Sequence, residues 1–293
     1  MNDDLRAGRL PPWLKKRLPT GGNMLEVMRL LRSQELHTVC EEARCPNLGE
    51  CFNRKTATFL ILGDTCTRGC SFCSVGSGNP TPADDGEPAR IKSTVENLGL
   101  KYVVITSVTR DDLDDGGAAH FANVIRAVRE VSPQPMVEVL TPDFNGNIDA
   151  ILTVALASPD VYNHNLETVE ELYPIVRPKA DYRRSLDLLK TVKDKFDGII
   201  TKTGVMVGLG EDIEQLRKLF YDVARVNCDM MTIGQYLKPS PGKIEIAKYY
   251  TPGEFEDLRD LALESGIRYV FSGPFVRSSF MAGEAYSALL HRP

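Results

Sequence analysis

The chain has 293 residues, of which 42% are hydrophobic and 26% are charged, and its formal net charge is −5. This composition is ordinary for a globular protein and indicates no function by itself. The negative balance argues against a general affinity for nucleic acid, which requires a broadly basic surface. The opening MNDDLRAGRL lacks the basic start and apolar core of a signal peptide, and no apolar run approaches the ~20 residues of a membrane-spanning helix. We therefore expect a cytoplasmic protein with neither a membrane nor a nucleic-acid partner.

Residues 1–57 are expected to form an N-terminal extension placed before the main domain. Apolar side chains recur near helical spacing from Met24 to Gln34, which predicts an amphipathic helix, and a loop rich in cysteine follows. The stretch from Leu5 to Leu25 contains five basic residues and no acid: Arg6, Arg9, Lys15, Lys16 and Arg17. Such a stretch is either a solvated arm or a docking segment for an acidic partner.

From Thr58 onward, short apolar runs alternate with helical patterns. The runs are TFLIL at 58–62, YVVITSV at 102–108, MVEVL at 136–140, VYNHN at 161–165, GVMVGL at 204–209 and MTIGQYL at 231–237. This alternation indicates a parallel sheet with crossover helices, and six units are too few for a closed eight-fold barrel. We expect an α/β fold, a partial (β/α)6 TIM-type barrel over 58–266 with N-terminal and C-terminal extensions. A doubly wound sheet is the alternative that alternation alone leaves open.

A complete set of helix signals marks the end of the expected barrel. Thr251 is placed to cap a helix, Pro252 takes its first position, Glu254 completes a capping box and Gly266 follows the last turn. Beyond this helix, the apolar run YVFSGPFV leads into the sequence RSSF and a short tail. We expect residues 267–293 to form the C-terminal extension.

Six of the seven cysteines lie between Cys40 and Cys73, while Cys228 stands alone where a small apolar core residue is expected. Six cysteines could form three disulfides, but a chain of this length needs no staples and nothing marks it for export. Ligation of a metal by thiolates is the better interpretation. Cys66, Cys70 and Cys73 form C-x3-C-x2-C directly after the first expected strand, at the end where parallel barrels place their active sites.

This triad suits an iron–sulfur cluster better than zinc. A structural zinc site needs four protein ligands, usually as two C-x2-C pairs, and here only Cys70 and Cys73 form such a pair. Three thiolates match three corners of a four-iron cluster and leave its remaining iron open. With Phe72 before the third cysteine, the motif resembles the signature of the radical S-adenosylmethionine superfamily. In that superfamily the open iron binds the methionine moiety of S-adenosylmethionine, whose reductive cleavage gives a 5'-deoxyadenosyl radical that abstracts hydrogen from an unactivated carbon.

Two further segments resemble the superfamily's cofactor contacts, and a third, at the end of the fourth strand, lies where such contacts are expected. DDLDDGGAAH, after the second expected strand, contains a similar glycine pair, although Ala118 stands in place of the usual acid. GVMVGLGE, at the fifth strand, resembles the adenine-support pattern G-x-I-x-G-x-x-E with Met for Ile, and HNLE ends the fourth strand. Glycines at strand ends are also common for backbone reasons, so a structural role is the alternative. The residues expected to contact S-adenosylmethionine are Gly116, Gly117, Asn165, Glu167, Gly204, Met206 and Gly208.

Cys40, Cys45 and Cys51 form a second triad, C-x4-C-x5-C, whose spacing matches neither a zinc ribbon nor a CxxC redox pair. Three thiolates leave this site one ligand short, and Cys228 is one candidate for the fourth. The C-x4-C-x5-C block together with an RSSY-like sequence near the C-terminus resembles the lipoyl synthase family. In that family the second serine of the motif ligates an auxiliary four-iron cluster, and here it corresponds to Ser279.

This resemblance covers most of the chain and extends through TSVTRDDLDDGGAAH, EVLTPDF and VYNHNLETV. Phe280 replaces the family's tyrosine, and none of the departures falls on an expected iron ligand. A serine alkoxide is a harder and less natural ligand for iron than a thiolate, so we expect the bond from Ser279 to be the easiest to break.

The resemblance implies an enzyme that inserts two sulfur atoms, at C6 and C8, into an octanoyl group bound to a lysine of a carrier protein. It further implies two 4Fe-4S clusters and S-adenosylmethionine as cofactors, with the auxiliary cluster as the sulfur source. The implied partners are an octanoylated lipoyl carrier protein or domain and an electron donor such as ferredoxin or flavodoxin. One alternative is another two-cluster radical enzyme, similar to biotin synthase or to a methylthiotransferase. A non-catalytic iron–sulfur or zinc protein is the alternative from another class, and the two incomplete triads count against it.

Overall fold

The computed structural model describes residues 10–16, 23–54 and 56–290; for Leu290 it describes the backbone alone. Within these residues the main sheet has eight strands in the order β1-β2-β5-β6-β7-β8-β9-β10. β1 runs antiparallel to β2, and every other neighbouring pair in the sheet is parallel. The strands of this sheet are β1 (His37–Thr38), β2 (Thr58–Ile61), β5 (Tyr102–Ser107), β6 (Met136–Leu140), β7 (Val161–Asn163), β8 (Ile200–Val207), β9 (Met230–Gln235) and β10 (Tyr269–Gly273).

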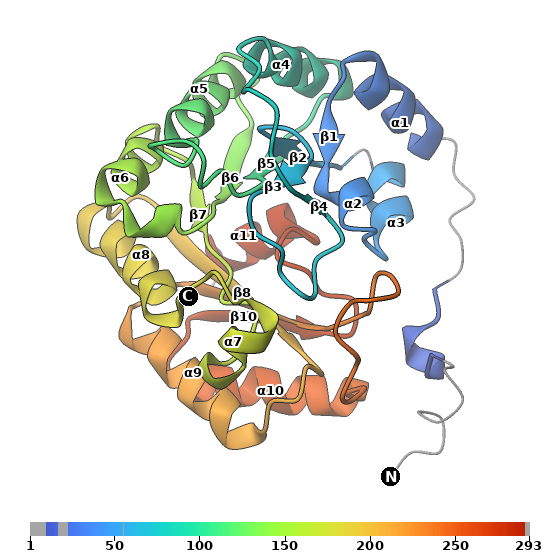
Figure 1. The fold of residues 1–293 in the computed structure, drawn as a ribbon, viewed down its shortest axis with the longest axis vertical. Coiled ribbons are helices and arrows are strands. Elements are labelled where there is room, and N and C mark those ends of the chain that lie inside the picture. The colour runs from blue at the N-terminus through green and yellow to red at the C-terminus, as the bar shows by residue number, and fades with distance from the viewer. Residues whose placement is uncertain (1–9, 17–22, 55, 291–293) are drawn as a thin grey trace.

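Helices surround the outer face of this curved sheet (Figure 1). Those that follow strands of the barrel on this face are α4 (Glu87–Leu98), α5 (Ala118–Arg129), α6 (Ile148–Leu156), α8 (Tyr182–Lys195), α9 (Ile213–Arg225) and α10 (Pro252–Glu264), whereas α11 (Ala282–Leu290) follows β10 and lies inside the ring. The N-terminal part contains α1 (Asn23–Ser33), α2 (Val39–Glu42) and α3 (Leu48–Asn53), and α7 (Tyr173–Val176) precedes α8. Short 3-10 helices occupy Pro12–Leu14, Phe144–Gly146 and Glu170–Leu172, and a second sheet pairs β3 (Thr65–Cys66) with β4 (Gly76–Ser77).

The predicted partial barrel is therefore confirmed, with two differences. β8 begins at Ile200, four residues before the apolar run that predicted it. The run did not extend to the start of the strand because the first residues of β8 include the polar side chains of Thr201 and Lys202, which are buried. The run after α10 forms β10, which pairs with β9 over five residues and adds a parallel strand to the six predicted. The division of the chain at residues 57 and 266 stays a prediction.

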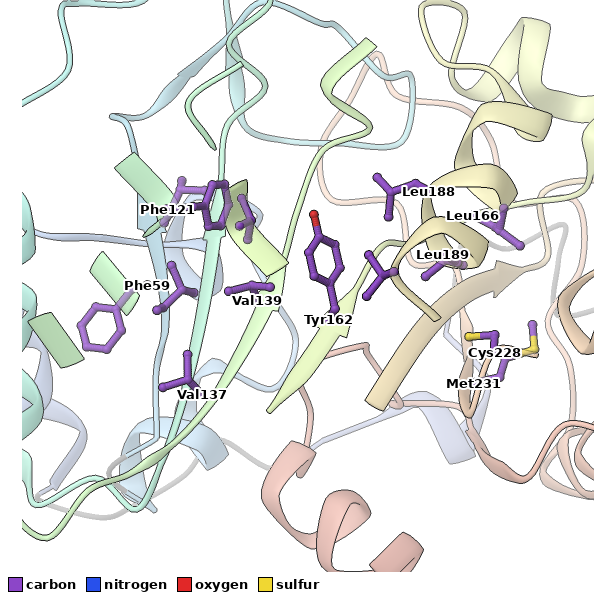
Figure 2. Packing of buried hydrophobic residues seen from close by; sticks show 14 of the residues in the cluster. Phe59, Phe121, Val137, Val139, Tyr162, Leu166, Leu188, Leu189, Cys228 and Met231 are labelled. Carbon is purple, nitrogen blue, oxygen red and sulfur yellow. The ribbon is translucent and has the colours of Figure 1, made fainter. Parts of the chain in front are cut away.

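Alternation along each strand separates the outer core from the barrel interior. Outward-facing side chains pack under the helices, and Figure 2 shows Tyr162 of β7 between Val139 of β6 and Leu189 of α8. Cys228 lies in this same core and is 3% exposed, which confirms its prediction as a small core residue. The amphipathic helix predicted near the N-terminus is α1, which buries Val27 and Leu31.

Local signals set the bounds of α10 as predicted. Thr251 Oγ1 accepts the backbone N–H of Glu254, and the Glu254 side chain accepts the backbone N–H of Thr251. Gly266 follows the helix with φ of +103°, a conformation that favours glycine. None of the helices in the described part of the chain combines the length and the apolar character that crossing a membrane requires.

Within the described residues, the sheet is open between its end strands, β1 and β10. The C-terminal segment begins at one of these strands, β10. Residues 274–281 follow the carboxyl end of β10, and α11 then packs Ala285 and Leu289 against Met230, the first residue of β9. In Figure 1, α11 lies within the ring of strands and helices. The segment between β10 and α11 thus connects the carboxyl end of the barrel to its amino end.

A buried polar layer crosses the barrel interior. Lys202 Nζ contacts both carboxylate oxygens of Glu138, at 2.9 and 3.0 Å, and the two side chains are at most 1% exposed. Asn163 Nδ2 and the Tyr102 hydroxyl also donate to Glu138, at 3.1 and 2.7 Å. Burial and the neighbouring carboxylate hold the pKa of Tyr102 above its ordinary value, so its hydroxyl stays a donor.

A second buried carboxylate ties the amino ends of three strands together. Asp229 accepts hydrogen bonds from Lys193, from Arg268 and from the backbone N–H of Thr201. Burial acts to raise the pKa of Asp229, but the bonds from Lys193 and Thr201 outweigh it and hold this pKa below its usual range.

Candidate functional site

A cavity of about 500 Å³ lies at the carboxyl ends of the parallel strands. Its wall includes the first residues after several strands, among them Val108 after β5, Thr141 after β6 and His164 after β7. Both cysteine triads line it: Cys40, Cys45, Cys51, Cys66, Cys70 and Cys73. Asn165, Glu167, Met206 and Ser279 line the same cavity. The structure thus brings together residues that are up to 239 positions apart in the sequence, Cys40 and Ser279.

The loop after β2 holds the C-x3-C-x2-C triad. The backbone leaves β2 through Leu62 and Gly63, both with positive φ, and enters β3 at Thr65. Cys66 Sγ accepts the backbone N–H groups of Arg68 and Thr109, each at 3.3 Å. Hydrogen bonds to cluster sulfurs adjust the reduction potential of an iron–sulfur centre, so these two donors suit a redox role for Cys66.

The second triad lies on two short helices and the turn between them, which contains Cys45. Thr38 caps α2 by accepting the backbone N–H of Glu41, and Cys40 lies in that helix. The backbone N–H of Cys45 donates to the carbonyl of Cys40 at 3.0 Å, which turns the chain after the helix, and Cys51 lies in α3. The chain from Cys40 to Cys51 thereby presents three thiols to one cavity.

The segment Arg277–Phe280 reaches this cavity because the neighbouring strand makes room for it. A Cβ on Gly234 of β9 would lie 2.0 Å from the carbonyl oxygen of Val276, so only glycine allows the chain to cross there. Asn165 Nδ2 then donates to Ser278 Oγ at 3.2 Å, and Ser279 lines the cavity.

Lys16 fastens this segment from the N-terminal side. Its ammonium group donates to Asn47 and to Glu50, the latter at 2.8 Å, and lies 4.5 and 5.3 Å from the ring centres of Phe275 and Phe280. Asn47 Nδ2 in turn donates to the carbonyl of Phe275 at 2.7 Å. Cation–π contacts and a charge-assisted hydrogen bond stabilise this set of contacts. We call the contacts of Lys16 with Asn47, Glu50, Phe275 and Phe280 the clasp.

This clasp changes the interpretation of the basic N-terminal stretch. Lys16 is engaged within the chain, with only 28% of its side chain exposed, so it contributes little to a docking surface. Lys15 is exposed. Arg6, Arg9 and Arg17, the other basic residues of the docking hypothesis, lie outside the described residues.

Burial controls the protonation of the cysteine thiols. It raises the pKa of Cys40 to about 12 and that of Cys51 to about 11, and the neighbouring Cys45 adds to both shifts. Burial also raises the pKa of Cys73, to about 11, and that of Cys70, where nearby Arg177 opposes the effect. Because metals bind the thiolate, loading these sites must displace protons.

The opposite wall of the cavity presents polar atoms whose hydrogen bonds are not made within the described chain. They are Ser107 Oγ, Thr141 Oγ1, His164 Nε2, Asn165 Oδ1 and Arg177 Nε. Burial, with Arg177 nearby, lowers the pKa of His164 to about 4, so its imidazole is neutral. Because Nδ1 of His164 lies 2.8 Å from the carbonyl of Thr141 and must donate to it, Nε2 is an acceptor.

Asn165 connects this wall to the C-terminal segment. Its amide nitrogen donates to Glu167 Oε1 at 3.0 Å as well as to Ser278. Burial raises the pKa of Glu167, while Arg177 and Asn165 oppose the shift. Glu167 has a positive φ of 66° and exchanges backbone hydrogen bonds with β8, which fixes its side chain at the cavity.

The four glycines predicted to contact the cofactor are not among the residues that line this cavity. A Cβ on Gly204 would meet Asn165 Oδ1 at 2.9 Å, so this glycine gives Asn165 its position. Gly208, Gly116 and Gly117 have positive φ, and a Cβ on Gly117 would meet Leu62 at 2.3 Å. Backbone conformation and packing account for these glycines, and their contact with the cofactor stays a prediction.

The donor set fits the two clusters and the cofactor. All seven cysteines are free thiols. In the part of the chain that the structure describes, no three His, Cys, Asp or Glu side chains are arranged around a single ion. A four-iron cluster needs no such arrangement, because each thiolate binds a different iron. The buried acceptors and the arginine on the facing wall match the amine, hydroxyl and carboxylate groups of S-adenosylmethionine.

Comparison with protein families places the chain. The model of the radical SAM superfamily matches residues 60–222, and that of the N-terminal domain of lipoyl synthase of the radical SAM family matches residues 2–45. A lipoyl synthase from Caldicellulosiruptor saccharolyticus is 53% identical over 94% of this chain and 96% of its own length. The chain belongs to the lipoyl synthase family. A lipoyl synthase from Rubrobacter xylanophilus is also 53% identical, over 95% of this chain and 87% of its own.

Solved structures support the fold alone. A crystal structure of methylornithine synthase has a TM-score of 0.55 and 17% identity, and covers 75% of this chain and 72% of its own. That of Streptococcus suis SuiB bound to S-adenosylmethionine has a TM-score of 0.56 and 15% identity, with coverage of 85% and 60%.

Membership in this family confirms the predicted chemistry at the level of the whole protein. The chain is a radical SAM enzyme with lipoyl synthase activity. Enzymes of this family carry S-adenosylmethionine and two 4Fe-4S clusters, and act on an octanoylated carrier protein or domain.

The sequence analysis assigned no role in the site to three residues. Arg177 and Arg277 are half-buried and lie close enough to Cys70 and Cys45, respectively, to interact with their charges, and Lys16 clasps the C-terminal segment. Arginines and lysines in ordinary contexts are most often exposed, so their types carried no signal. The location of Arg277 in the RSSF motif was a signal that could have been used.

Proposed function

We propose that sulfur insertion at C6 and C8 of the octanoyl group takes place in the cavity between the two cysteine triads. The observation that carries this proposal is that a single cavity is lined by both triads, by Ser279 and by buried polar groups suited to S-adenosylmethionine. A substrate carbon held there lies between the source of the radical and the source of sulfur.

In this proposal each triad holds one cluster. Cys66, Cys70 and Cys73 hold the cluster that binds the cofactor. The auxiliary cluster is held by Cys40, Cys45, Cys51 and Ser279. When bound, the clusters and the cofactor supply the radical that removes hydrogen from the octanoyl chain and the sulfur that replaces it.

The facing wall would hold S-adenosylmethionine. The Arg177 guanidinium, which lies close enough to Cys70 to affect its pKa, is placed to bind the carboxylate of the methionine moiety. Asn165 Oδ1 and His164 Nε2 are acceptors for amine or hydroxyl groups of the cofactor, and Met206 offers an apolar contact. Gly116, Gly117, Gly204 and Gly208 would support the same cofactor through the backbone.

The remaining cavity wall suits an acyl chain. Leu60, Val108, Leu140 and Phe72 contribute apolar surface to it. Burial of methylene groups against such a wall favours binding by about 0.8 kcal/mol each, and it excludes water from the reacting carbon. The site thereby selects an aliphatic substrate and protects a reactive intermediate.

An electron donor such as ferredoxin or flavodoxin would approach from outside the cavity. A cleft of about 470 Å³ borders Cys70 on the protein surface and is lined by Arg68 and Lys179. Lys179 Nζ donates to the carbonyl of Thr67, an uncharged partner, so its charge remains available to an acidic donor protein. We also retain the sequence-based proposal of a cytoplasmic location.

Anaerobic turnover tests the function. The protein, reconstituted with iron and sulfide, is given dithionite, S-adenosylmethionine and a peptide with an octanoylated lysine. Mass spectrometry should find two added sulfur atoms in the peptide and two molecules of 5'-deoxyadenosine for each product. A gain of sulfur without release of the nucleoside would exclude a radical route.

The auxiliary ligand set has its own test. Reconstituted protein should contain about eight irons per chain, four for each cluster. Ser279→Ala should lose auxiliary iron and fall toward about four, since one ligand is removed, whereas the matched control Ser278→Ala should keep about eight. Equal iron content in the two variants would reject Ser279 as a ligand.

A further inference from the structure

A second cavity, of about 880 Å³, lies toward the amino end of the barrel. We call it the lower cavity. It is lined by the connection between α4 and β5 at Gly99–Lys101, by the start of β6 at Met136 and by residues of α11 such as Ser287. None of these residues lines the cavity described above, which we call the upper cavity.

The two cavities share part of one wall. Cys51, Ser279 and Phe280 line both of them. Cys51 comes from α3, and Ser279 comes from the segment between β10 and α11. Two of the four proposed auxiliary ligands therefore face the lower cavity as well as the upper one.

The cavities approach each other at the wall formed by these shared residues rather than along the barrel axis. Along β6, Met136 lines the lower cavity and Leu140 lines the upper one, and Glu138 lies between them. Glu138 belongs to the buried layer with Lys202, which fills the barrel at that level. Packed side chains leave little room for passage through the axis.

We propose that the lower cavity is a second access route to the auxiliary site, by which ferrous ions and small metal-binding molecules reach Cys51 and Ser279 while substrate occupies the upper cavity. This inference rests on the proposed ligand set of the auxiliary cluster. A cluster that gives up sulfur must have its ligands exposed again for rebuilding. Ser279 provides the weakest of those bonds, and it lies on the shared wall.

The mouth of the lower cavity carries a surface ion pair. Arg54, which follows α3, contacts Glu284 of α11, and the two side chains are about half exposed, at 48% and 51%. Exposed pairs of this kind stabilise a structure weakly, so the contact between α3 and α11 can open at little cost. Lys101 also lines this cavity.

A chelation experiment on the cluster-loaded protein tests the route. The protein is held under reducing, anaerobic conditions with S-adenosylmethionine analogue and octanoylated peptide bound, and iron release to bathophenanthroline disulfonate is followed by absorbance. Ser287→Trp, which narrows the mouth, should slow release of auxiliary iron at least fivefold. Its matched control is Ala288→Trp, an exposed neighbour on the same helix, which should behave as the unchanged protein. Arg54→Ala should accelerate release.

Thiol labelling of the cluster-free protein separates this inference from the ligand assignment. N-ethylmaleimide should label Cys51 at least threefold more slowly in Ser287→Trp, while labelling of Cys73, which faces the upper cavity, stays unchanged. Slower labelling with unchanged iron release would keep the route and reject Cys51 as an iron ligand. Unchanged labelling and unchanged release, in a variant with the normal circular dichroism spectrum, would overturn the route itself.

Discussion

Replacement of Glu138 by glutamine should destabilise the protein more than any surface substitution, because it leaves the ammonium group of Lys202 buried without its counter-ion. Four hydrogen bonds converge on the Glu138 carboxylate, and both members of the ion pair are at most 1% exposed. Removing one partner of a buried pair costs about 3–5 kcal/mol. We expect a loss near this range for Glu138→Gln, and a similar one for Lys202→Met.

The double variant Glu138→Leu/Lys202→Met provides the decisive comparison. A buried pair replaced by apolar residues of similar volume is often no less stable than the original, since neither charge is left uncompensated. The double variant should therefore cost no more than either single change. The free energy of unfolding is measured by urea titration with circular dichroism, and the unchanged protein, Glu138→Leu, Lys202→Met and the double variant form a double-mutant cycle.

A matched control comes from an exposed ion pair. Lys190 contacts Asp194 one turn along α8, with side chains 51% and 50% exposed. Lys190→Met should change the free energy of unfolding by no more than about 0.5 kcal/mol. If Glu138→Gln costs less than about 1 kcal/mol, or if the single losses simply add in the double variant, the account of the buried layer is wrong.

Three further predictions concern the clasp, the cofactor wall and pH. Lys16→Ala should speed the loss of auxiliary iron to a chelator by up to about fivefold, since roughly 1 kcal/mol of cation–π and hydrogen-bond stabilisation is removed. Lys15→Ala is the control, and equal rates in the two variants would contradict the clasp. Gly204→Ala should weaken binding of S-adenosylmethionine in equilibrium dialysis while iron content is kept, because the added methyl group displaces Asn165; unchanged affinity would exclude that contact. Asp229→Asn should lower stability at neutral pH, and the difference from the unchanged protein should shrink as pH falls. The pKa of this carboxyl is depressed in the folded state, so its contribution is present above about 3.9, the unfolded value, and is lost as pH falls through the folded one. If Asp229→Asn lost the same amount of stability at every pH between 7 and 3, the charge of Asp229 would not be the cause of that loss.

Much of the candidate site could be predicted from local spacing. Three cysteines within eight residues, at the end of a buried strand, predict an incomplete cluster site because chain geometry keeps neighbours in sequence close in space. The triad from Cys40 to Cys51 follows by the same reasoning. The fold class was equally accessible, since alternation of apolar runs with helical periodicity is a local property.

Other features depend on the assembled structure. Lys202 lies before the apolar run at 204–209, and the start of β8 was therefore wrong in the prediction from sequence. A buried charge is tolerated only where a partner from another strand meets it, and sequence periodicity does not report that partner. The place of β10 in the sheet follows from its pairing with β9, which no local signal encodes.

The sequence by itself determined which side chains can bind iron, the spacing of each cysteine triad and the sheet that carries them. Only the tertiary structure brought Ser279, from the far end of the chain, against the cysteines near its beginning, with Gly234 allowing the crossing and Lys16 fastening it. It also placed a second cavity behind Cys51 and Ser279. The physical reason is that spacing along the chain fixes only near neighbours, whereas contacts across more than two hundred residues depend on how complete surfaces pack.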